Sequence, residues 1–237
     1  MRCALCKREA ELKRSHIISE FLYKAMYDDI HRFHVLSSVP DLPDSMAQKG
    51  LREKLLCGRC ETHLSRFEKY ARDVLSGGVP LEYKKEGRVV QVYGVDYTQF
   101  KLFQLSILWR AGVSTLQMFE KVELGPHEPT LRQMLSESDP GHEHAYGCVM
   151  FGLVDEVGNR MDMIVQPRKI HIDGHACYRF IFGGFMWVYF VTNRKPTGSY
   201  KVGFLKETGE LAFVIKNILE AKDIVNFGKA RGRLGRG

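Results

Sequence analysis

The sequence lacks any run that approaches the roughly 20 apolar residues required by a membrane-spanning helix. The longest candidate, Phe180 to Thr192, is too short and contains Gly183 and Gly184. The N-terminus has no apolar segment of the kind found in secretory signals. We therefore expect a cytoplasmic protein with no membrane partner, whose cysteines are thiols or metal thiolates rather than disulfides.

Internal repeats are also absent, and the composition excludes several classes of protein. With 44% hydrophobic and 27% charged residues, most of the chain is expected to fold rather than to be disordered, collagen-like or a coiled coil. A length of 237 residues fits a small module followed by a larger domain.

The net charge of +7 favours an anionic partner without identifying it. Part of this charge lies in residues 228–237, which contain four cations and four glycines. Because nothing in this segment can pack, we predict a flexible basic tail. It could follow phosphates, or it could simply be solvated.

Four of the six cysteines form two pairs with the same Cys-x2-Cys spacing: Cys3, Cys6, Cys57 and Cys60. Thiolates at this spacing chelate one tetrahedral zinc ion, so we predict a structural Zn2+ site. A redox-active pair or four unrelated core cysteines would leave the matched spacing to chance. The other two cysteines lie in apolar runs and are expected to be buried thiols.

The second pair opens a predicted helix in which Leu64, Phe67, Ala71 and Leu75 recur at helical spacing. A zinc-bound turn followed by such a helix is the arrangement expected of a treble-clef module. The turn signal at residues 76–80 then suggests a domain boundary.

Beyond the boundary, the pattern predicts a larger domain with an antiparallel sheet. The predicted strands are residues 88–93, 147–154, 161–165, 178–182 and 185–191, and the predicted helices are residues 97–119, 129–135 and 211–223. The fold class is therefore α+β, with a zinc ββα module at residues 1–78, an α+β domain at residues 79–227 and the tail at residues 228–237.

The segment between the cysteine pairs contains His16-Ile17-Ile18 at the end of a predicted strand. The pattern is a Cys-x2-Cys pair, then a strand that ends in His-Ile-Ile, then a second Cys-x2-Cys pair that begins a helix. This order resembles the HNH endonuclease superfamily, which has a ββα-metal site. The resemblance covers about residues 1–75, a third of the chain.

The resemblance implies metal-dependent hydrolysis of phosphodiester bonds in DNA, with RNA as a further target class. His16 would be the general base, because a neutral imidazole can accept a proton from the attacking water. Catalytic Mg2+ or Mn2+ would be held partly by Glu61, with His63 as the alternative. Four basic residues near His16 are candidates for gripping the nucleic-acid backbone: Lys13, Arg14, Arg52 and Lys54.

The sequence departs from the family pattern at three places. Ser15 stands where aspartate often supplies a metal ligand, Ser19 stands where proline is common, and no asparagine occurs between His16 and Cys57. A hydroxyl is a poor substitute for a carboxylate on Mg2+, so Glu61 or Glu68 would have to compensate.

Each of these residues also has a simpler, structural explanation. His16 could be a structural histidine, Glu61 a carboxylate favoured by the helix dipole, and His63 a helix-surface residue. Glu68 and Arg72 suit a solvated ion pair at i,i+4 spacing.

The alternative function is therefore a non-catalytic zinc module that binds nucleic acid or a protein partner. Residues 79–227 would then recognise a partner or form a homodimer. Within that region, Arg110 interrupts an apolar helix and needs a buried partner or an exposed edge.

Overall fold

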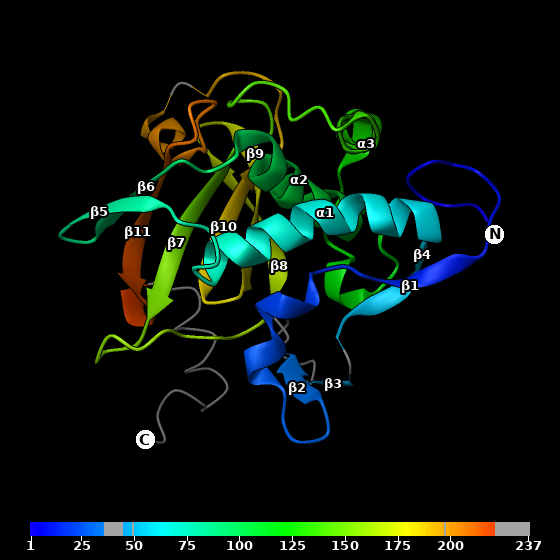
Figure 1. Cartoon of the computed structure of the whole chain (residues 1–237), viewed down its shortest axis with the longest axis horizontal. Coiled ribbons are helices and arrows are strands. Elements are labelled where there is room, and N and C mark those ends of the chain that lie inside the picture. Colours follow the sequence, from blue (N-terminus) through cyan, green and yellow to red (C-terminus); the bar gives the residue numbers. More distant parts are fainter. Residues whose placement is uncertain (36–44, 49, 197, 221–237) are drawn as a thin grey trace.

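The computed structural model describes residues 1–35, 45–48, 50–196 and 198–220. A short hairpin with one long helix packs beside a large twisted sheet, and a second helix lies between them (Figure 1). The predicted basic tail, residues 228–237, lies outside the described residues.

The N-terminal part is built from two strands and a helix. Strand β1 (Leu12–His16) pairs antiparallel with β4 (Arg52–Cys57), and α1 (Gly58–Leu75) follows directly. The segment between the two strands contains further short elements: η1 (Glu20–Leu22), η2 (Lys24–Met26), β2 (Arg32–Val35) and β3 (Ser45–Gln48).

The second part contains a seven-stranded sheet with the order β5-β6-β11-β7-β10-β9-β8. Its strands are β5 (Glu82–Glu86), β6 (Val89–Tyr93), β7 (Cys148–Val154), β8 (Val165–Ile172), β9 (His175–Phe182), β10 (Phe185–Phe190) and β11 (Leu211–Asn217). The other elements are α2 (Tyr97–Val113), α3 (Glu128–Glu137), η3 (Gln117–Phe119), η4 (Gly125–His127), η5 (Ser199–Gly203) and η6 (Ile218–Glu220).

Three expectations about this sheet are wrong. The segment that begins at Leu211 was expected to be a helix, but it forms strand β11, which suits its β-branched pair Val214 and Ile215. Strand β11 pairs antiparallel with β6 and parallel with β7, so the sheet is mixed rather than antiparallel. The expected strand at 161–165 is also wrong, since β8 begins only at Val165.

Helix α2 lies between α1 and the sheet (Figure 1) and is buried along most of its length. Asp96 caps its N-terminus by accepting a hydrogen bond from the backbone N–H of Gln99. The helix ends at Val113 instead of Phe119, because the chain turns into an extended conformation at Ser114. A helix buried all round is the expected consequence of this central position.

Alternate residues of the sheet strands supply two apolar clusters on its opposite faces. The cluster on the α2 face also contains Cys3, Leu12 and Leu64 from the N-terminal part, together with Trp109 and Trp187. The parts before and after residue 78 therefore share one hydrophobic core, and the division at this residue stays a prediction.

Candidate functional site

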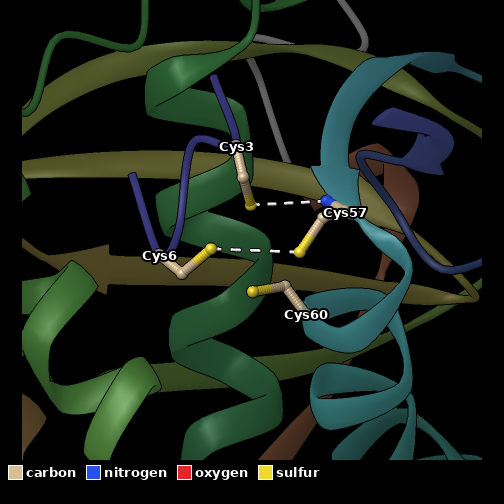
Figure 2. A group of neighbouring side chains, drawn as sticks. All are labelled: Cys3, Cys6, Cys57 and Cys60. Atoms are coloured by element: carbon tan, nitrogen blue, oxygen red, sulfur yellow. Dashed lines mark hydrogen bonds between the residues drawn. The ribbon is translucent and has the colours of Figure 1, made fainter. Parts of the chain in front are cut away.

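The four predicted zinc ligands come together at the start of α1. Figure 2 shows Cys3 and Cys6 from the N-terminal loop facing Cys57 and Cys60. All four Sγ atoms lie within 4.8 Å of one another, and the Sγ atoms of Cys6 and Cys57 are 3.9 Å apart. Zinc–sulfur bonds of about 2.3 Å in a tetrahedron place two sulfurs about 3.8 Å apart. The cluster therefore has the size required for a structural zinc ion.

The electrostatics of the cluster also suit a cation. Burial raises the pKa of Cys3, but backbone N–H groups directed at its sulfur outweigh this effect and lower that pKa to about 7. One of these bonds runs from the N–H of Cys57 to Sγ of Cys3, at 3.3 Å. Burial and the neighbouring thiols raise the pKa of Cys60. A bound zinc ion would stabilise all four thiolates and join the N-terminal loop to α1.

The pairing of β1 with β4 gathers cations around His16. Arg14 lies directly opposite Lys54, and His16 lies opposite Arg52. Directly opposite residues project from the same face of a hairpin, so these four side chains share one face. Among the residues that the structure describes, none forms an ion pair with Arg14, Arg52 or Lys54.

We call these four residues the cationic hairpin face. Two like charges directly opposite each other destabilise a strand pair unless an anion lies between them. The fourth predicted binder, Lys13, lies opposite Leu56 and is not part of this face; it is exposed and pairs with Glu11 at 3.1 Å.

The side chain of His16 lies against the segment that connects β1 to β4. Its ring is 6.3 Å from that of the buried Tyr23, measured between centroids. Gly50 completes this contact with a positive φ of 84°. A Cβ at residue 50 would lie 2.0 Å from the Tyr23 hydroxyl and 2.9 Å from Cδ2 of His16. Only glycine fits here, and no local sequence pattern indicates the contact between Gly50 and Tyr23.

The backbone of His16 is held by Arg110 of α2. Its carbonyl accepts a hydrogen bond of 2.7 Å from Arg110 Nη1, and Arg110 Nη2 pairs with Glu68 of α1. The expected ion pair between Glu68 and Arg72 is therefore wrong, since Arg72 pairs with Asp73 instead. Arg110 satisfies its need for a buried partner through Glu68, which could not be identified from the sequence.

The other candidate metal ligands near His16 are engaged elsewhere or lie apart. The Ser15 hydroxyl is buried and accepts a hydrogen bond from the N–H of Leu56. Glu61 belongs to the first turn of α1, about 10 Å along the helix from Glu68. The structure thus links His16 to Glu68 rather than to Glu61.

His63 connects α1 to α3. Its Nε2 donates to the carbonyl of Leu135 at 2.7 Å, because a carbonyl can only accept. Its Nδ1 therefore accepts from Arg66, at 3.0 Å. Both ring nitrogens are occupied in this arrangement, so His63 has a structural role here.

Among the described residues, the four cysteines form the one cluster of three or more metal-ligating side chains. Because the Ser15 hydroxyl and the Glu68 carboxylate take part in other contacts, neither is offered to a catalytic Mg2+ or Mn2+ ion near His16, and that ion stays a prediction.

Comparison with protein-family models, with curated proteins and with solved structures gave no match. The resemblance to HNH endonucleases therefore rests on the residues quoted above. No helix in the described part of the chain is both long and apolar enough to span a bilayer.

Proposed function

We propose that this protein is a zinc-stabilised, HNH-type nuclease that binds the phosphate backbone of DNA on the cationic hairpin face and cleaves it at His16. The observation that carries the proposal is the strand register, which pairs His16 with Arg52 next to the pair of Arg14 and Lys54. The module would be a treble clef, with zinc joining the N-terminal loop to α1.

The chemistry uses groups of this chain. The neutral imidazole of His16 accepts a proton from water as the water oxygen bonds to phosphorus. The bond between phosphorus and the leaving oxygen breaks, and that oxygen takes a proton from solvent. Guanidinium and ammonium groups at Arg14, Arg52 and Lys54 offset the negative charge on the phosphate.

The test is cleavage of plasmid DNA by purified protein with Mg2+ or Mn2+, after one zinc ion per chain has been verified. We expect nicking that is lost in His16→Ala and retained in His171→Ala, which removes an exposed histidine of β8. Equal cleavage by His16→Ala and the native protein would contradict the assignment of the base. An RNA substrate in parallel decides between the two nucleic acids.

A second candidate is a zinc module that binds nucleic acid without cutting it. The buried Ser15 hydroxyl and the engaged Glu68 carboxylate favour it, because both groups are withdrawn from a catalytic ion. Salt-sensitive DNA binding by zinc-loaded protein, without cleavage under any metal, would select this function. The cations of the hairpin favour a nucleic acid over a protein partner.

A further inference from the structure

Arg110 connects three elements that are far apart in the sequence. It is 1% exposed within the apolar helix α2. One amino group of its guanidinium donates to the carbonyl of His16 at the end of β1, and the other pairs with Glu68 of α1. The planar guanidinium presents these donors in a fixed geometry, so it sets the position of the His16 peptide relative to both helices.

A second contact fixes the neighbouring strand. Glu53 of β4 lies opposite Ser15, one position along from the pair of His16 and Arg52. The Glu53 carboxylate accepts two hydrogen bonds from Thr115, one from the backbone N–H at 3.2 Å and one from the side-chain hydroxyl at 2.7 Å. Thr115 lies two residues after the end of α2. Both strands of the hairpin are therefore anchored to the C-terminal end of α2 beside His16.

We propose that Arg110, supported by Glu68, is a positioning residue for His16, so that the second part of the chain completes the nuclease site. The inference rests on the proposed function for its activity readout. In this proposal, residues after 78 hold the His16 imidazole at the distance and angle needed for proton transfer.

Stability alone is a weak explanation of this arrangement. A buried ion pair contributes little to stability, since an apolar pair of similar size is often as good. In addition, Nε of Arg110 is buried without a hydrogen-bond partner in the described part of the chain. The feature that an apolar replacement could not reproduce is the hydrogen bond to the His16 carbonyl.

This difference defines the test. Arg110→Met alone leaves the Glu68 carboxylate unpaired and can unfold the protein, so the decisive variant is Arg110→Met/Glu68→Leu. Lys101→Met is the control, because it removes the other buried cation of α2, which donates hydrogen bonds to the backbone carbonyls of Glu143 and Tyr146. Measurements are zinc content, denaturant unfolding, DNA affinity, cleavage rate and the imidazole NMR resonances of His16.

For the double variant we expect native zinc content and stability, DNA affinity within about threefold of native, and cleavage slowed by about 10- to 100-fold. The His16 resonances should shift or broaden, whereas Lys101→Met should leave them and the cleavage rate unchanged. A double variant that cuts at the native rate with native His16 resonances overturns the inference.

The two proposals fail separately. Native protein that binds but never cuts DNA overturns the nuclease, and the His16 resonances of the double variant then decide the inference alone. Unchanged resonances would contradict a positioning role, whereas resonances that shift in the double variant and stay native in Lys101→Met would show that Arg110 fixes the His16 ring, without a role in cleavage.

Discussion

Gly50 lies at the closest approach between the connecting segment and His16. In Gly50→Ala, the new methyl group would collide with Tyr23 and His16 and would also require a positive φ. We expect the free energy of unfolding to fall by about 2–4 kcal/mol, from backbone strain together with overpacking. Gly87→Ala is the matched control, because Gly87 also has a positive φ but faces open space, so only about 1–2 kcal/mol should be lost. Denaturant unfolding measures both, and equal losses would refute the close packing.

Lys101 gives the stability a defined pH dependence. It is buried against two backbone carbonyls, and burial lowers its pKa to about 8. An unfolded lysine has a pKa of about 10.4, so above pH 8 the unfolded state binds more protons than the folded state. Stability from this group therefore rises with pH. Between pH 7 and 9 we expect native protein to gain about 1 kcal/mol relative to Lys101→Met, as measured by urea unfolding at both pH values. If the unfolding free energies of native protein and Lys101→Met changed equally with pH, the pKa of Lys101 would not be lowered by folding.

At the residue level, spacing alone predicted the cysteine cluster, because four thiols at matched positions suit one tetrahedral ion. It did not predict the pairing of Glu68 with Arg110. That contact depends on the angle at which α1 crosses α2, and a local sequence pattern does not determine a helix crossing angle. In the sequence, Arg110 stands out only because an arginine in an apolar helix needs a partner.

At the level of elements, DNA is predicted to bind to the hairpin of β1 and β4. Arg14→Gln/Lys54→Gln removes the like-charged pair, so DNA affinity should fall and the slope of log K against log salt should decrease by about 2. Stability should stay the same or rise by a few tenths of a kcal/mol, since the repulsion is removed.

The control for this variant is Lys84→Gln/Lys85→Gln, which makes the same charge change in the exposed strand β5. Salt-dependent DNA binding of the native protein and the two double variants can be followed by fluorescence anisotropy. If both double variants lose affinity equally, the effect reflects net charge rather than the hairpin face.

Some elements depend on contacts between residues close in the sequence, and others depend on pairing with distant strands. The turn between β9 and β10 and the cap of α2 are local features, and Gly183-Gly184 and Asp96 are residues of the types that favour them. Strand β11 depends on its position between β6 and β7, which precede it in the sequence by about 120 and about 60 residues. Its helix-like length and mixed composition gave no sign of that pairing.

On the scale of the whole molecule, the shared core predicts that the metal centre and the sheet unfold together. Trp109 and Trp187 are buried in the second part and report on it by fluorescence, while zinc release reports on the N-terminal part. In a urea titration we expect both signals to have the same midpoint. Loss of a structural metal belongs to the few changes that cost more than about 4 kcal/mol, so chelation should lower the tryptophan-detected Tm by about 10 °C. Zinc release with an unchanged tryptophan transition would instead establish two independent units and would separate Arg110 from the site it is proposed to hold.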